Sequence, residues 1–243
     1  MRFKNSLKHR SESATLANLY PTPSIDCYRL IVLFFETTPK IDRIEAALEK
    51  LPEPAAVHFA KCDAHSERAS LWTRNPTGCL PIGRLALEYA EDNVNFSVAF
   101  TLAESLGGEA HWCLGSSPIA HPLVNPSTFS GTLQLCCFKR AEGLSDGDLK
   151  RIWFNEHAPV AVETQNNVGY RQNLVLSSSH SALDGIVEEL FPIEAADSLT
   201  DFFADGDDPE KMMNHIHRLT ESSERVLDLE KSSVIHMTEQ RLR

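Results

Sequence analysis

The sequence predicts an α+β fold made of two tandem units, each with the strand–helix order β-α-β-β-α-β of the ferredoxin-like plan. Three observations support this prediction: apolar runs with strand-like alternation, apolar residues at helical spacing between them, and the return of the same order in the second half of the 243-residue chain. The halves share little residue-level identity, so the repeat lies in element order. Two such units can pack sheet on sheet and close a barrel whose interior cavity suits a small, mostly apolar ligand.

The first unit is expected at residues 25–115, after a polar, flexible tail at residues 1–24. A continuous apolar run at 27–36 is short enough for a buried strand. The next segment, 38–53, has apolar residues at helical spacing and closes at Pro52. The remaining elements expected in this unit are strands at 55–64, 83–91 and 109–115 and a helix at 95–108.

The second unit is expected at residues 132–243. It follows a stretch at 116–131 that is rich in Pro, Ser and Thr and is typical of an interdomain linker or a long loop. Ser145 and Asp148, three residues apart, suit the amino terminus of a helix. The elements expected here are strands at 132–140, 168–178, 184–193 and 232–240 and helices at 143–162 and 208–228.

The composition excludes several classes of partner. The net charge of -11 repels phosphate backbones, so we expect no nucleic-acid partner. The longest apolar run, residues 30–35, is too short to cross a bilayer, so we expect no membrane partner. The tail lacks the apolar core of a signal peptide; it is either a transit peptide or a disordered segment. We therefore expect a cytoplasmic protein.

No motif indicates a metal or a cofactor. The six cysteines include no C-x-x-C pair, and we expect them to be reduced, buried fillers. His215 and His217 lie two apart on an expected helix, so they point to nearly opposite sides and cannot share one ion. No G-x-G-x-x-G and no C-x-x-C-H motif is present. We expect no cofactor, although isolated histidines such as His236 leave haem open.

Four motifs in the second half point to one family. The segment 143–162 carries Trp153, His157 and Pro159 in the spacing Trp-x-x-x-His-x-Pro, and the segment 170–173 reads Tyr-x-Gln-Asn. Two further segments, DGIVEELFPIEAADSL and VIHMTEQ, each join an apolar strand to acidic residues. In this order, between about residues 133 and 241, the motifs resemble the EthD domain, a member of the dimeric α+β barrel superfamily.

The resemblance implies a dimeric-type α+β barrel formed within one chain. EthD-like proteins accompany the oxidative breakdown of small organic compounds, and fungal relatives act in aromatic polyketide pathways. Superfamily relatives include cofactor-free monooxygenases, isomerases, cyclases, decarboxylases and some haem-binding enzymes, so the fold alone does not name the chemistry. Two features depart from the pattern: Ala158 stands where the family usually has Gly, and the first half lacks the Trp-x-x-x-His-x-Pro motif.

His157 is the principal candidate for a catalytic group. It falls on the apolar stripe of its helix, one turn from Trp153. One interpretation is a core histidine that bonds a backbone carbonyl. The other, which the family motif favours, is a general acid/base, because an imidazole can pass protons near neutral pH.

The other candidates are assigned to the same cavity. We predict that Tyr170 and Gln172 act with His157 by polarising a substrate carbonyl, although a strand tyrosine often only packs its ring. Arg171 alternates with Tyr170 and is expected to face solvent or a helix end. The residues predicted to bind substrate are Trp153, Asn173, Phe191 and His236.

Two hypotheses of function follow. In the first, the protein is an enzyme that binds a small hydrophobic or aromatic metabolite and catalyses cofactor-independent oxidation, dehydration, decarboxylation or cyclisation. In the second, it is a binding or accessory module that supports a partner oxygenase without chemistry of its own. A homodimer is possible in either case.

Overall fold

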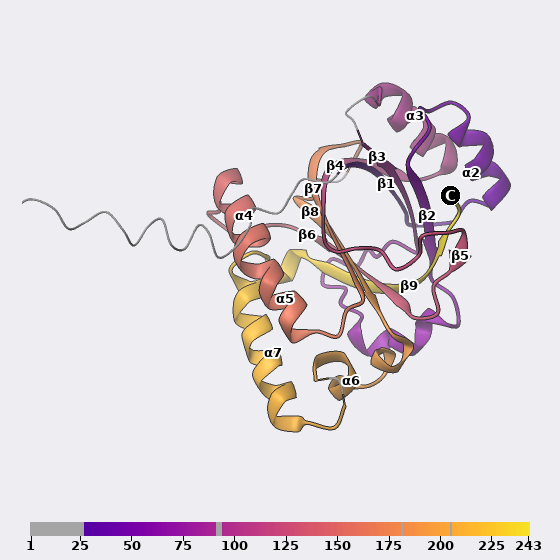
Figure 1. The fold of residues 1–243 in the computed structure, drawn as a ribbon. Helices are drawn as coiled ribbons and strands as arrows, with labels where there is room; N and C mark the ends of the chain where they lie inside the picture. The colour runs from indigo at the N-terminus through magenta and orange to yellow at the C-terminus, as the bar shows by residue number, and fades with distance from the viewer. Residues whose placement is uncertain (1–26, 91–93, 181, 205) are drawn as a thin grey trace, which may run out of the picture.

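The computed structural model describes residues 27–90, 94–180, 182–204 and 206–243. The predicted tail, residues 1–24, lies outside the described residues. The fold is α+β, with an antiparallel barrel and helices on its outside (Figure 1).

Eight strands form the barrel, four from each half of the chain. They follow one another around it in the order β2-β3-β1-β4-β7-β8-β6-β9, and β9 pairs with β2 to close the ring. All these pairings are antiparallel. The strands are β1 (Cys27–Phe34), β2 (Ala56–Lys61), β3 (Gly83–Tyr89), β4 (Glu109–Ile119), β6 (Thr132–Phe138), β7 (Gly169–Ser178), β8 (Gly185–Phe191) and β9 (Ser233–Arg241).

The two halves join through hydrogen-bonded strand edges. β4 of the first half pairs with β7 of the second, and β9 of the second half pairs with β2 of the first. The expected α+β barrel is confirmed, and its sheet is one continuous sheet that curves into a closed ring; that the halves are tandem ferredoxin-like units stays a prediction. Closure leaves neither half with a free edge at these two seams, which removes a surface prone to aggregation.

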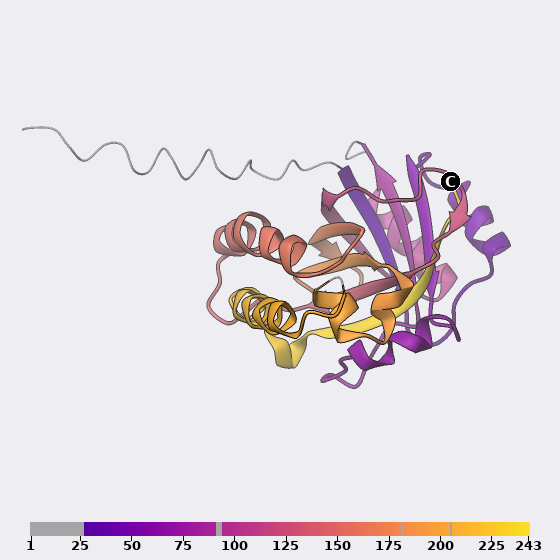
Figure 2. The ribbon, with the colours of Figure 1, turned by 60° about the horizontal axis from the view of Figure 1, so that its bottom comes forward.

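Helices cover the outside of both halves. The first half carries α2 (Ile41–Leu48) and α3 (Phe96–Leu106). Over the second half, α5 (Ala158–Thr164) and α7 (Pro209–Glu224) lie side by side in both views (Figures 1 and 2). Along the chain, α4 (Asp146–Ile152) precedes α5, and α6 (Leu199–Phe203) precedes α7. A π-helical turn at Trp153–His157 and short 3-10 segments at Ser66–Trp72, Ile193–Ala196 and Leu229–Lys231 complete the described helical elements.

Strand alternation gives every strand an inner and an outer face. One apolar cluster takes residues from both halves, among them Ile31, Leu133 and Met237, and fills part of the barrel interior. Two other clusters join strand residues to the helices of each half. In β7, Tyr170 and Leu174 belong to such an outer cluster. Arg171 between them therefore faces the interior.

Three segments differ from the sequence prediction. β4 extends four residues beyond the expected end at residue 115, because its second part pairs with β7 of the other half. The expected linker 116–131 accordingly begins as a strand, and it also contributes β5 (Ser127–Thr128), which pairs with β9. The helix expected at 143–162 is divided by a π-helical turn at Trp153–His157. The division of the chain into two domains at this linker stays a prediction.

Among the residues that the structure describes, no helix is both long enough and apolar enough to span a bilayer.

Candidate functional site

Six of the seven predicted site residues lie outside the barrel, beneath or within its helical cover. Trp153 and His157 belong to the π-helical turn, and the outer strand faces carry Tyr170, Gln172, Phe191 and His236. Asn173 faces the barrel interior, where it meets Arg29 and Glu188. The structure thus brings most of the predicted residues to the layer between sheet and helices, and separates Asn173 from them.

His157 is buried against α7. Its Nδ1 lies 3.0 Å from the hydroxyl of Ser222. Burial lowers the pKa of this imidazole to about 4, with Arg225 adding to the effect and Ser222 opposing it, so the ring is neutral at pH 7. Ser222 is the partner through its hydroxyl and through its backbone, in line with the core-histidine interpretation considered from the sequence.

A row of polar side chains crosses the outer face of the second-half sheet. Tyr170 on β7 stands opposite Glu189 on β8, Glu189 stands opposite Gln134 on β6, and Gln134 stands opposite His236 on β9. Tyr170, Glu189 and His236 are buried, and Gln134 is half-buried. We call these four residues the outer polar row. Two of them, Tyr170 and His236, were predicted from the sequence as site residues.

Hydrogen bonds in this row all run toward Glu189. Gln134 Nε2 donates to one carboxylate oxygen of Glu189 at 2.9 Å, and Asn167 Nδ2 donates to the other at 3.0 Å. The Gln134 carbonyl lies 3.2 Å from His236 Nε2, and the Thr132 hydroxyl lies 3.1 Å from His236 Nδ1. A neutral His236 satisfies both contacts when Nε2 carries the proton and Nδ1 accepts from Thr132. Thr132 then donates to His236, His236 donates to Gln134, and Gln134 donates to the Glu189 carboxylate.

Glu189 is the one member of the row with a pKa near neutrality. Burial raises the pKa of its carboxyl to about 7, although the hydrogen bonds from Asn167 and Gln134 favour the ionised form. At pH 7 the group is therefore divided between its acid and its carboxylate forms. This is the protonation behaviour expected of a general acid/base.

The Tyr170 hydroxyl is buried beside Trp153 and Gln172. Burial raises its pKa well above the usual value, Glu189 adds to this, and Trp153 and Gln172 oppose it, so the phenol keeps its proton. The Gln172 amide donates to the Trp153 carbonyl at 3.3 Å. Trp153 Nε1 and Gln172 Oε1 are buried and make no hydrogen bond of ordinary geometry with any residue that the structure describes. Buried polar atoms of this kind require a partner.

The barrel interior holds a second polar group, made of three arginines and three glutamates. Arg84 pairs with Glu188 at 2.8 Å and with Glu239, and Arg171 pairs with Glu239 at 2.8 Å and with Glu188 at 3.3 Å. Arg29 pairs with Glu88 at 3.0 Å. The expectation that Arg171 faces solvent or a helix end is wrong, because the opposite side of β7 is the inside of a closed barrel. We call these six residues the interior ion network.

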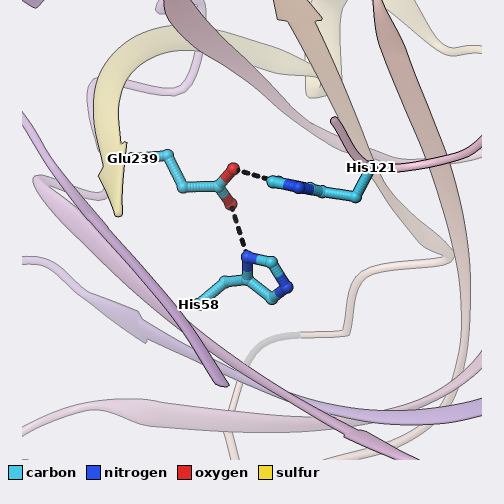
Figure 3. A group of neighbouring side chains, drawn as sticks. All are labelled: His58, His121 and Glu239. Atoms are coloured by element: carbon cyan, nitrogen blue, oxygen red, sulfur yellow. Dashed lines mark hydrogen bonds and ion pairs between the residues drawn. The ribbon is translucent and has the colours of Figure 1, made fainter. Parts of the chain in front are cut away.

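Two histidines adjoin this network (Figure 3). His121 Nε2 lies 2.6 Å from Glu239 Oε2, and His58 Nδ1 lies 3.9 Å from Glu239 Oε1. Burial lowers the pKa of His58 far below its usual value, with Arg171 adding to this. The nitrogens of both rings and a carboxylate oxygen lie within 4.8 Å of one another, a grouping with the donor types of a metal site.

The sequence did contain a signal for Glu189 and for the interior network. Glu188 and Glu189 are adjacent in an otherwise apolar strand. Since neighbouring strand residues face opposite sides, a strand buried on both faces must place one glutamate in each layer. The sequence could not reveal which partners each carboxyl meets, because Arg84, Arg171 and Gln134 lie on other strands.

Comparisons with known proteins show a likeness of structure. No family model and no curated protein sequence matches the chain. A solved structure described as an anthrone oxidase-like protein aligns with 90% of this chain and 92% of that chain, with 9% sequence identity and a TM-score of 0.49. Membership of the EthD family therefore stays a prediction.

Proposed function

We propose that the protein binds a small, mainly apolar or aromatic metabolite between the second-half sheet and its helices. The carboxyl of Glu189 removes a proton from one atom of this metabolite and returns it to another. The reaction class is proton-transfer chemistry such as enolisation, dehydration, decarboxylation or cyclisation. We further propose that the two halves are tandem ferredoxin-like units and that the second is EthD-like, as its motifs suggest.

The observation that carries the proposal is a buried carboxyl near neutrality that accepts two hydrogen bonds and has, at its cross-strand neighbour, buried polar atoms without a hydrogen bond of ordinary geometry. Glu189 accepts from Gln134 and Asn167. The side chains of Trp153 and Gln172 hydrogen-bond the hydroxyl of its cross-strand neighbour Tyr170, but Trp153 Nε1 and Gln172 Oε1 reach no hydrogen bond of ordinary geometry with any described residue. A substrate carbonyl or hydroxyl oxygen would accept from Trp153 Nε1, a substrate hydroxyl would donate to Gln172 Oε1, and aromatic rings nearby would contact the apolar part of the substrate.

Each side chain has a distinct part in this reaction. The carboxylate form of Glu189 accepts a proton from an acidified C–H or O–H of the substrate, and the acid form returns it to another atom. The Tyr170 hydroxyl donates a hydrogen bond to the substrate oxygen that gains negative charge. Trp153 and Phe191 provide aromatic surface. Cofactor-independent oxidation would begin with the same deprotonation and would use dioxygen as the oxidant.

Glu189 suits the acid/base role better than His157. His157 has its Nδ1 engaged by Ser222, and its lowered pKa makes it a weak base. We propose that His157 supports the site by holding the π-helical turn, and with it Trp153, against α7.

The proposal is tested with an aromatic ketone, which combines an apolar ring system with C–H bonds that its carbonyl acidifies. The probe is 1-tetralone in D2O, with exchange of its α-protons followed by NMR and its binding measured by calorimetry. We expect the full chain to bind 1-tetralone and accelerate exchange, and Glu189→Gln to bind it while losing about 100-fold or more of the exchange rate. Tyr170→Phe should also exchange more slowly, and Glu163→Gln, a change at the surface, should match the wild type.

Two other outcomes separate the hypotheses. Binding by the wild type without accelerated exchange would favour a binding or accessory module. Neither binding nor exchange, or exchange that persists in Glu189→Gln, would contradict the proposed site.

A further inference from the structure

We infer that His58, His121 and Glu239 form a binding site for one divalent transition-metal cation, such as Zn2+, inside the barrel. The inference rests on the barrel interior and is independent of the function proposed for the outer polar row. The three residues come from distant parts of the chain and meet only because the barrel closes (Figure 3).

The position of each ligand is fixed by a different element. His58 is on β2 and Glu239 is on β9, the two strands that close the barrel. His121 is in the segment between β4 and β5, which passes across the end of the barrel in the view of Figure 1. Leu123 of this segment packs against the interior apolar cluster, which holds His121 over Glu239.

His58 supplies the observation that points to a ligand. Its side chain is 1% exposed, and its Nδ1 has no hydrogen-bond partner among the described residues. This nitrogen lies 3.9 Å from Glu239 Oε1, and the His58 and His121 rings are 4.3 Å apart between centroids. A buried imidazole nitrogen without a partner carries a desolvation cost that a metal ion would remove.

The spacing of the donor atoms is close to that of a zinc site. Metal bonds of about 2.1 Å place tetrahedral ligand atoms about 3.4 Å apart. The donor atoms here lie within 4.8 Å of one another, so small side-chain rotations bring them to that spacing. Two imidazoles and one carboxylate favour ions such as zinc or cobalt and leave a fourth position for water.

The two arginines around Glu239 orient the carboxylate. Arg84 and Arg171 both donate to Oε1, which leaves Oε2 directed at His121. This arrangement resembles the outer hydrogen bonds that fix metal-binding carboxylates. Their positive charges oppose a dication, and Glu188, paired with both arginines, offsets part of that repulsion.

Metal binding requires a change in the tautomer of His121. The Leu123 amide donates to His121 Nδ1 at 3.0 Å, so the proton of a neutral ring is on Nε2 and points at Glu239. A metal at Nε2 displaces that proton to Nδ1, and the Leu123 amide then loses its acceptor. Without metal, a neutral His121 donates from Nε2 to the Glu239 carboxylate, and His58 Nδ1 keeps no partner among the described residues.

Cobalt is the probe for the test, because bound Co2+ gives visible d–d absorption bands. We expect the full chain to bind one Co2+ with new visible bands, and Zn2+ to displace it. His58→Ala and His121→Ala should each lose the bands. The control His217→Ala, an exposed histidine on α7, should retain them.

A second measurement needs no variant and so does not depend on the folding of one. Zn2+ added to 15N-labelled protein should move the His121 proton from Nε2 to Nδ1 and shift the Leu123 amide resonance. The inference is overturned if the wild type shows no Co2+ bands, if the bands persist in both histidine variants, or if Zn2+ leaves His58, His121 and Leu123 unchanged.

Discussion

Neighbouring glutamates on β8 show how the two faces of one strand set opposite protonation states. Glu188 faces the interior, where Arg171 and Arg84 outweigh the effect of burial and lower its pKa. Glu189 faces the helical layer, where burial raises its pKa to about 7 and its direct partners are the neutral amides of Asn167 and Gln134. The same residue type is thus a fixed charge on one side of the strand and a group that titrates near pH 7 on the other.

His157 predicts a specific pH dependence of stability. Its pKa falls from 6.5 in the unfolded chain to about 4 in the folded protein. Between these values the unfolded state binds the extra proton, so the free energy of unfolding decreases as the pH falls from 6.5 toward 4. At about 1.4 kcal/mol per unit, this histidine accounts for a loss of about 3 kcal/mol.

The variant His157→Asn tests this, because its amide can still contact Ser222 but does not titrate in this range. Urea denaturation at pH 7, 6, 5 and 4 should show a shallower loss of stability in His157→Asn than in the wild type. His217→Asn, exposed on α7, should keep the wild-type slope. Equal slopes in all three proteins would show that His157 is not buried in a neutral form.

At the scale of elements, the position of Trp153 depends on a glycine in β8. A Cβ at Gly185 would lie 2.4 Å from the Phe138 ring and 2.8 Å from the Trp153 ring. The absence of a side chain there lets the two rings meet edge to face against the sheet, with centroids 4.8 Å apart. The π-helical turn therefore places Trp153 in a space that only glycine leaves open.

Gly185→Ala should accordingly lower the free energy of unfolding by about 1–3 kcal/mol, because overpacking displaces both rings. Gly147→Ala is the matched control, since its Cβ meets nothing closer than 3.8 Å and alanine favours the helix α4. Thermal unfolding of the two variants measures the difference. A Gly185→Ala protein as stable as Gly147→Ala would contradict this packing.

Most elements could be predicted from the sequence, because their periodicity is local. The strand at 27–36 and the helix at 95–108 both appear, the latter as α3 with Asn95 as its cap and Gly107 at its end. The full length of β4 could not be predicted, because it depends on pairing with β7 some sixty residues later. The π-helical turn has no periodic signature either, and it divides what the sequence presents as one helix.

At the scale of the whole molecule, the interior ion network ties the two halves together. Arg84 of the first half contacts Glu188 and Glu239 of the second, and Arg171 of the second half lies 3.9 Å from Glu88 of the first. The six charges sum to zero, so the interior can hold them without a net buried charge. Its contacts between the halves join strands that do not pair with each other, β3 with β7, β8 and β9, so they add to the pairing at the seams.

Arg84→Met should therefore destabilise the protein by about 3–5 kcal/mol, because Glu188 and Glu239 each lose one of their two arginine partners and the buried network is left with a net negative charge. Arg218→Met, which removes an exposed pair with Glu163, should cost less than about 1 kcal/mol. Urea denaturation at pH 7 compares them. Similar small losses in both would mean that the interior is hydrated and the network contributes little.

The location of the site illustrates what a sequence can and cannot provide. Alternation placed Tyr170 and Arg171 on opposite faces correctly, but which face is the barrel interior depends on closure by β4–β7 and β9–β2 pairing. For the same reason Asn173, predicted beside Gln172, lies on the other side of the sheet. The sequence did not single out Glu189 as a site residue, because its raised pKa and its hydrogen bonds depend on residues of other strands and loops.

The most direct test of the central claim is the titration of the Glu189 carboxyl. Protein labelled with 13C at glutamate Cδ would be followed by NMR from pH 4 to 9, with Glu189→Gln assigning the resonance. The account predicts a single midpoint near pH 7 that is missing from the variant and that shifts when 1-tetralone binds. A midpoint near 4.5, the ordinary value for glutamate, would show that Glu189 is a plain carboxylate at neutral pH and would contradict its role as the acid/base group.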